Sequence, residues 1–148
     1  MITWTYKHFT ELTTKELYQI LTLRSLVFVV EQNCVYLDLD QKDCNCWHLC
    51  GWEAEELVAY ARVLAPGVSY EEASIGRVVT SPNHRKKGYG RALMKEAIQK
   101  TRAQFNTTWI KIGAQCYLIN FYESFGFRVS SEEYMEDGIP HIEMQLDA

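Results

Sequence analysis

The chain reads HRKKGYGRALM from residue 84 to residue 94. Before this stretch, SIGRVVTS has the composition of a strand that Pro82 stops, and after it an amphipathic run predicts a helix over about 89–104. The first amides of a helix have no partner inside the helix, and they carry the positive end of its dipole. Glycines let the backbone fold close to a bound group. The stretch therefore predicts a phosphate site held mainly by main-chain N–H groups.

The basic residues of this turn stand out against an acidic chain. Four of them surround the predicted site: Arg85, Lys86, Lys87 and Arg91. The 148 residues together carry a formal net charge of -4, whereas nucleic-acid modules usually carry a basic excess. The composition therefore argues against nucleic-acid binding, and any phosphate affinity must be local.

The sequence has no N-terminal signal pattern and no run near the roughly 20 apolar residues of a membrane span, so no membrane contact is expected. Five cysteines, an odd number with uneven spacing, favour reduced thiols in a cytoplasmic protein.

Outward from the basic turn, the hydrophobic periodicity predicts one α/β domain over residues 1–148 with a mixed sheet. Strands are expected at 2–9, 46–53, 57–64, 74–81, 108–115, 127–131 and 141–147. One helix should begin after Thr13, the N-cap of a capping box with Glu16, and run to about Val30. Others are expected over about 89–104 and over 117–125, where Gly126 ends the helix.

Two motifs resemble landmarks of the GCN5-related N-acetyltransferase (GNAT) superfamily. Arg85-x-x-Gly88-x-Gly90, between a strand and a helix, matches the family's pyrophosphate-binding pattern. Downstream, FYESFGF at 121–127 resembles the family's aromatic-Tyr-Glu-x-x-Gly-Phe segment. The N-terminal part, LRSLVFVVEQNCVYLDLDQKD at 23–43 and HL at 48–49, is similar to the ElaA-like branch. The resemblance covers nearly the whole chain and implies a single-domain GNAT fold, a mixed sheet of about six to seven strands flanked by three to four helices.

The resemblance also implies acetyl-CoA as cosubstrate, without a metal. Its pyrophosphate would lie on the turn formed by Arg85, Lys86, Lys87, Gly88, Tyr89, Gly90 and Arg91. The pantetheine arm would pair with the backbone at Val78 and Val79, and Gln115 would offer an amide contact. Tyr122 lies on the position that protonates the departing thiolate. A phenol suits this step, because its pKa near 10 is within a unit or two of an alkyl thiol's.

The function that follows is acetyl transfer to a primary amine, of a small molecule or a peptide, by direct attack in a ternary complex. The alternative is a catalytically silent CoA-binding module, a sensor or regulatory subunit, because Gln115 and Leu118 replace the family's usual Asn and Ala. The strand 74–81 lacks the Glu that some members use as a base, so the general base stays unassigned. Sheet-edge dimers are common in the family, so a homodimer is a further expectation.

The pattern Cys44-x-Cys46-x-His48-x-Cys50 offers four metal-ligand types. In a strand, side chains on one face stand about 6.5 Å apart, too far for the zinc–sulfur distances near 2.3 Å of a tetrahedral site. Buried thiols beside a hydrogen-bonded His48 are the preferred interpretation.

The run Asp38, Asp40 and Asp43, with Glu31 before it, gives the connection at 31–43 its acidic character. The first interpretation is a solvated loop. Two others stay open: an electrostatic lure for a cationic acceptor amine, or structural ion pairs that involve Arg24 and Glu31.

Overall fold

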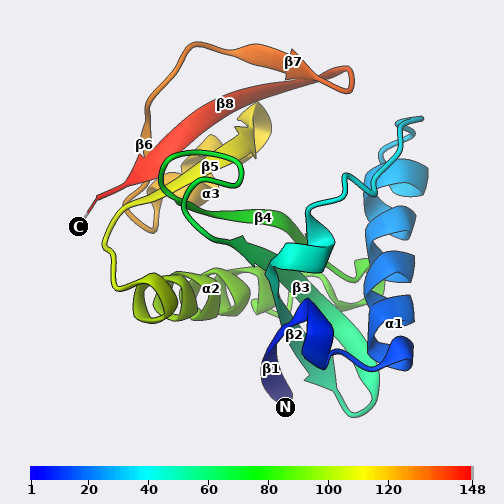
Figure 1. Ribbon diagram of the computed structural model, residues 1–148. Coiled ribbons are helices and arrows are strands. Elements are labelled where there is room, and N and C mark those ends of the chain that lie inside the picture. The colour runs from blue at the N-terminus through cyan, green and yellow to red at the C-terminus, as the bar shows by residue number, and fades with distance from the viewer. Residues whose placement is uncertain (148) are drawn as a thin grey trace.

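The computed structural model describes residues 1–147, and within them eight strands form one mixed sheet (Figure 1). The order across the sheet is β1 (Ile2–His8), β2 (Trp47–Glu53), β3 (Glu56–Leu64), β4 (Ala73–Thr80), β5 (Ile110–Gln115), β8 (Ile139–Leu146) and β6 (Arg128–Val129), and β7 (Tyr134–Glu136) pairs with β8. Neighbours are antiparallel except β4 and β5. The predicted mixed α/β sheet is confirmed, with β7 as an additional strand.

The parallel neighbours β4 and β5 are joined only near their first residues. The ladder pairs Ala73 with Ile110 and Ser74 with Lys111, and it ends there although both strands continue. Each strand stays paired on its other side, β4 with β3 and β5 with β8. Two strand edges with free N–H and C=O groups therefore face each other across a slit in the middle of the sheet.

A β-bulge interrupts β4 beside this slit. Tyr60 pairs with Val79 and Arg62 with Gly76, so one residue of β3 opposes two of β4, Arg77 and Val78. Arg77 takes the left-handed conformation with a φ of 50°, which is unusual for a residue with a side chain. Its guanidinium holds Asp38, with Nε 2.8 Å from the carboxylate and Nη2 2.9 Å from the carbonyl oxygen. These bonds hold a strained backbone in place.

Helices cover both faces of the sheet (Figure 1). On one face α2 (Tyr89–Phe105) buries Leu93 and Met94, and α3 (Ile119–Glu123) contributes Tyr122 to the same core cluster. On the other face α1 (Thr14–Arg24) buries Ile20 beside Tyr60 of β3. The strand supplies both layers because successive side chains point to opposite faces.

The predicted helix starts are confirmed where caps were visible. Thr13 Oγ1 accepts from the Glu16 N–H at 3.1 Å, and the Glu16 carboxylate accepts from the Thr13 N–H at 2.8 Å. The helix predicted over 117–125 is shorter than expected: a 3-10 turn occupies Cys116–Leu118, α3 ends at Glu123, and Gly126, with a φ of 101°, lies in the turn after it. Among the described residues, no helix has both the length and the apolarity needed to cross a membrane.

The helix predicted to run to Val30 changes its winding on the way. α1 ends at Arg24, and Ser25–Glu31 form a π-helix, in which the Gln32 N–H bonds to the Val27 carbonyl at 3.1 Å. π-turns widen the helix locally and are frequent at functional sites. Here the widened turn leads into the slit region with Phe28, Glu31 and Gln32.

The C-terminal region differs most from the prediction. The strand expected at 127–131 is reduced to Arg128–Val129, and the segment before β8 forms the hairpin β7–β8. Its turn residues Asp137 and Gly138 both have positive φ, 51° and 78°. Such turns match the twist of the strands they join, and Asp-Gly is a preferred sequence for them.

Candidate functional site

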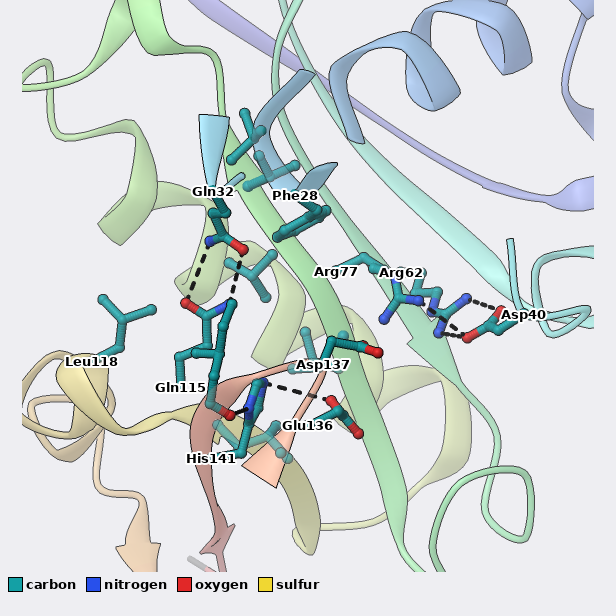
Figure 2. Close-up of a pocket in the computed structure, with 18 of the residues that line it drawn as sticks. Phe28, Gln32, Asp40, Arg62, Arg77, Gln115, Leu118, Glu136, Asp137 and His141 are labelled. Carbon is teal, nitrogen blue, oxygen red and sulfur yellow. Dashed lines mark hydrogen bonds and ion pairs between the residues drawn. The ribbon is translucent and has the colours of Figure 1, made fainter. Parts of the chain in front are cut away.

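A cavity of about 970 Å³ occupies the slit between β4 and β5. Its walls come from both layers of the molecule. Phe28, Glu31 and Gln32 line it from the π-helix side, while Leu118 and Tyr122 line it from the α3 side. The β7–β8 hairpin closes another side with Glu136, Asp137 and His141 (Figure 2). The cavity therefore extends through the split in the sheet, from the π-helix side to the α3 side.

A smaller pocket of about 250 Å³ lies at the N-terminus of α2. Gly88 is the N-cap with a φ of 76°, and Lys86 also takes a positive φ of 68°. Six of the seven predicted pyrophosphate residues line this pocket: Arg85, Lys86, Gly88, Tyr89, Gly90 and Arg91. Thr80 and Arg85 line both cavities, so the helix N-terminus and the slit are continuous.

Several side chains of this turn are already engaged. The Lys87 ammonium lies 3.7 Å from Glu53 in the β2–β3 hairpin, away from the pocket lining, and the Tyr89 hydroxyl donates to the same carboxylate. Arg91 donates to the Ser124 hydroxyl at 2.9 Å. The main-chain amides and the Lys86 ammonium are the groups that the turn leaves for an anion.

Arg85 holds a carboxylate across the mouth of the slit. Its Nη1 and Nη2 lie 2.8 and 2.5 Å from the two oxygens of Glu31, the last residue of the π-helix. A bidentate pair is the geometry that a guanidinium also offers to phosphate. Any phosphate that binds Arg85 must therefore compete with Glu31.

Tyr122 of α3 lines the slit, and its neighbour Phe121 lines the smaller pocket at the start of α2. Its side chain is buried against Phe121 and Phe127, with ring centroids at 5.2 and 6.0 Å, and the residue lines the cavity. Burial raises the pKa of Tyr122 to about 12. The hydroxyl therefore stays protonated at neutral pH, and it is a weaker acid than the free phenol, whose pKa near 10 is the better match to a thiol.

The predicted strand residues also meet at the slit. Val78 belongs to the bulge, Val79 is buried beside α1, and both line the cavity. Gln115 ends β5 and exchanges two long hydrogen bonds of 3.4 Å with Gln32 (Figure 2). This amide pair joins the end of the π-helix to β5 across the cavity.

The acidic run is not a solvated loop, because its carboxylates are paired with arginines and two of them are buried. Asp38, Asp40 and Asp43 face three arginines from α1, β3 and β4. Arg24 lies 2.8 Å from Asp38 and 2.7 Å from Asp43. Arg62 binds Asp43 at 3.0 Å and also Asp40, while Arg77 binds Asp38. We call these six residues the Arg–Asp network; three positive charges balance three negative ones.

The network is largely buried. Arg24 is fully inaccessible, and Arg62 and Asp43 are only 4% and 6% exposed. Burial opposes ionisation of Asp43, but hydrogen bonds and charge from Arg24 and Arg62 outweigh it and hold its pKa below the usual range. Of the open interpretations, structural ion pairs fit Arg24 best, whereas Glu31 pairs with Arg85 instead.

One group of potential metal ligands exists among the described residues: Asp43, Cys46 and His48, with ligand atoms within 4.8 Å of one another. Their lone pairs are occupied. His48 Nε2 donates to the Asp43 carbonyl at 3.0 Å, its Nδ1 accepts from the Tyr60 hydroxyl at 2.6 Å, and the Asp43 carboxylate holds both arginines. Burial raises the pKa of the Cys46 thiol to about 12, so the thiolate that a metal needs is disfavoured. These residues fit a structural cluster better than a metal site.

Sequence reasoning missed the residues that the β7–β8 hairpin brings to the cavity. His141 of β8 lies between Gln115 of β5 and Tyr134 of β7, and Glu136 faces it (Figure 2). The Asp137-Gly138 pair was the available signal, because this dipeptide marks a tight hairpin. It would have placed Glu136 and His141 on paired strands.

Comparison with known proteins agrees with this architecture. The model of the acetyltransferase (GNAT) domain family matches residues 24–148. Protein ElaA of Escherichia coli is 44% identical over 146 residues, 97% of this chain and 95% of that protein. Its crystal structure superposes with a TM-score of 0.93 at 43% identity, covering 99% of this chain and 100% of that one.

Two further solved structures have a similar fold. An acyl-CoA N-acyltransferase from Pseudomonas aeruginosa has a TM-score of 0.94 and 41% identity, covering 99% of both chains. An acetyltransferase of Bacillus subtilis, solved in complex with CoA, has a TM-score of 0.66 at 22% identity, covering 100% of this chain and 99% of that one.

Proposed function

The chain belongs to the GNAT acetyltransferase family, and on this premise we propose that it transfers an acetyl group from acetyl-CoA to a primary amine. The observation that carries the proposal is the continuity of two features. A helix N-terminus with free amides opens directly onto a slit between two unpaired strand edges. A ligand with a pyrophosphate at one end and an amide-bearing arm at the other matches both. The Bacillus subtilis relative in fold was solved with CoA, the same kind of molecule.

The cofactor would lie along the exposed edge of β4. The amides at the start of α2 would bind the pyrophosphate, and the backbone at Val78 and Val79 would pair with the pantetheine amides. The bulge turns part of the β4 backbone out of the ladder with β3, so a bulge N–H is free to polarise the thioester carbonyl.

Acetyl transfer would then proceed by direct attack. The neutral amine adds to the thioester carbonyl, and the tetrahedral intermediate collapses with loss of the CoA thiolate. Tyr122 donates a proton to that sulfur, because its buried hydroxyl is still protonated when the thiolate leaves. The cavity supplies proximity by holding the two substrates side by side.

The test is an acetylation screen with thiol release as readout. Spermidine, lysine amide and short peptides with free N-termini serve as acceptors, and acetyl-CoA is the donor. We expect turnover with at least one of them, above the rate of acetyl-CoA hydrolysis. A thermal-shift series runs alongside: CoA and acetyl-CoA should raise the melting temperature, whereas ATP and NAD should not.

The two readouts separate the proposal from its alternative. Stabilisation by CoA without acetylation of any amine would favour the silent CoA-binding module, for which the departures at Gln115 and Leu118 provide the motive. Stabilisation by ATP or NAD alone would overturn both.

A further inference from the structure

His141 is a buried histidine that faces the acceptor side of the cavity. It is 7% exposed and lies on β8, where Gln115 of β5 is its neighbour on one side. On the other side, the ring of Tyr134 of β7 stacks against the imidazole, with 5.9 Å between the ring centroids. Gln115, its direct cross-strand neighbour, is the residue that reaches across to Gln32 of the opposite wall. The imidazole therefore stands at the end of β5, where the slit opens toward the β7–β8 hairpin (Figure 2).

The hydrogen bonding of His141 fixes its tautomer. Nδ1 lies 2.8 Å from the carbonyl oxygen of Ile139, an atom that can only accept. Nδ1 must therefore carry the hydrogen. In the neutral ring, Nε2 is then left with a lone pair and no proton, which is the form that can act as a base.

The Nε2 atom does not point at a donor. It faces the Glu136 carboxylate at 3.5 Å, a distance too long for a good hydrogen bond. A lone pair and a carboxylate that face each other are mutually repulsive unless a cation lies near both. An ammonium nitrogen about 2.8 Å from each atom would satisfy the two acceptors at once.

The surroundings favour a cation at this point. Glu136 is exposed to the cavity, and Asp137 follows it in the turn. Three arginines line the cavity, and each is already paired with a carboxylate: Arg62 with Asp40, Arg77 with Asp38 and Arg85 with Glu31. The hairpin side of the cavity thus carries the groups that attract an amine, whereas the phosphate turn lies at the other end.

We propose that His141 is the general base of the acetyl transfer, and that Glu136 binds the acceptor ammonium beside its Nε2 atom. The proposal rests on the acetyltransferase function proposed above and names a residue and a substrate class for it: an amine that is cationic when it binds. It supplies the base that β4 lacks, because residues 74–81 contain no carboxylate.

The protons balance in this scheme. The acceptor nitrogen arrives with three protons, and the amide keeps one. His141 Nε2 removes the first, directly or through one water, and frees the lone pair that forms the N–C bond. The C–S bond then breaks, Tyr122 protonates the thiolate, and the second proton from nitrogen restores the Tyr122 hydroxyl. His141 finally releases its proton to solvent, so each turnover yields one proton in solution.

The kinetic test uses His141→Asn. The Asn amide keeps a donor near the position of Nδ1, so the bond to the Ile139 carbonyl is retained while the basic nitrogen is lost. With spermidine or lysine amide as acceptor, we expect kcat/KM to fall by a factor of about 10² or more. The dissociation constant of acetyl-CoA should change less than twofold. Millimolar imidazole should partly restore turnover in His141→Ala.

Glu136→Gln tests the ammonium site. We expect KM for the amine to rise about tenfold, with a smaller change in kcat, because the variant loses the negative charge that binds the ammonium. A tenfold change in binding corresponds to about 1.4 kcal/mol. Glu132→Gln is the matched control: Glu132 is exposed on the same segment, does not line the cavity, and loses the same charge. It should leave KM unchanged.

A measurement independent of turnover separates this inference from the proposed function. Long-range nitrogen–proton NMR spectra of the free protein should show His141 with its hydrogen on Nδ1, and ethylammonium chloride added with CoA should shift its ring signals. An Nε2–H tautomer, or undiminished turnover in His141→Asn, overturns the role of His141 while acetylation by the wild type would stand. A wild type that acetylates no amine overturns the proposed function. The NMR spectra still determine the tautomer of His141 in that case, because they need no turnover.

Discussion

Tyr122 and Glu31 are two cavity residues whose surroundings shift their pKa values in opposite directions. The Tyr122 hydroxyl lies in an apolar setting that keeps it protonated, with a pKa of about 12. The hydrogen bonds from Arg85 to the Glu31 carboxylate are the main cause that lowers the pKa of Glu31, and burial has a smaller effect on this pKa. Tyr122 thus keeps the proton that the proposed mechanism uses, and Glu31 occupies the guanidinium proposed to bind phosphate.

Replacing Tyr122 by Phe removes the proposed proton donor and keeps the ring packing. We expect kcat to fall tenfold or more in thiol-release assays, with acetyl-CoA binding unchanged. Because the raised pKa keeps the phenol protonated, the wild-type kcat should show no alkaline loss below about pH 10. Unchanged kcat in the variant would assign Tyr122 to the core alone.

Replacing Glu31 by Gln removes the competitor for Arg85. The pair is about 40% exposed on both sides, with values of 42% and 39%, so its free energy is that of a surface ion pair, below about 1 kcal/mol. We expect CoA to bind two- to fivefold more tightly, measured by calorimetry at low salt. Arg85→Gln should act in the other direction; weaker binding in Glu31→Gln would mean that Glu31 orders the turn instead of blocking it.

The turn before α2 is the element in which backbone and side chains can be separated. A Cβ at position 90 would meet only the Phe121 ring, at an ordinary contact distance of 3.8 Å, so the free protein has room for a Cβ there. At position 88 there is also room, but the φ of 76° makes any side chain strained.

Gly90→Val therefore isolates cofactor approach from folding. We expect its melting temperature to stay near that of the wild type, and its dissociation constant for CoA to rise at least tenfold, because the valine would occupy the space over the first amides of α2. Lys86→Ala, which removes one charge, should weaken binding less. The reverse order in a binding titration would mean that charge, not the glycine turn, holds the pyrophosphate.

The elements differ in how much of them local sequence could predict. The Thr13 cap, the turn at 84–94 and α2 were predicted because each depends on residues close together in the chain. The π-helix was not, because one widened turn leaves an apolar pattern that still fits ordinary helical spacing. The strand β7 is three residues long, too short to show an alternating hydrophobic pattern, so the Asp137-Gly138 turn was the available sign of it.

The candidate site divides in the same way. The turn at 84–94 and Tyr122 belong to local motifs, so the sequence singled them out, and the structure puts both beside the cavities. His141 and Glu136 meet only through strand pairing, and Arg62 and Arg77 looked like ordinary strand residues until β3 and β4 met the acidic loop. Contacts between distant segments set those roles.

At the scale of the whole molecule, the Arg–Asp network joins α1, the loop after the π-helix, β3 and β4. Removing Asp43 would leave Arg24 and Arg62 partly unpaired in a buried site, so we expect Asp43→Ala to lower the free energy of unfolding by about 3–5 kcal/mol. Urea unfolding measures it. Asp147→Asn, which disrupts the exposed pair with Arg128, is the control and should cost less than about 1 kcal/mol.

The network also gives stability a pH dependence with a defined sign. The folded pKa of Asp43 lies below its unfolded value, so its contribution is present above about pH 4 and is lost as the pH falls through the folded pKa. Asp43→Asn should therefore unfold with a shallower dependence on pH in this range than the wild type does. An unchanged slope would contradict the lowered pKa.

The short ladder between β4 and β5 has a mechanical consequence. Two residue pairs, at Ala73–Ile110 and Ser74–Lys111, are all that the backbone ladder provides between the first four strands and the last four, with α2 as the connecting segment. In the free protein the two half-sheets are therefore joined by backbone bonds at one end only, and elsewhere by side-chain packing in their shared core. A bound arm that bonds to both edges would act as a strut between them. Saturation with cofactor would then couple the halves into one cooperative unit, and amide hydrogen exchange in β5 and β8 would slow in step with that in β3 and β4.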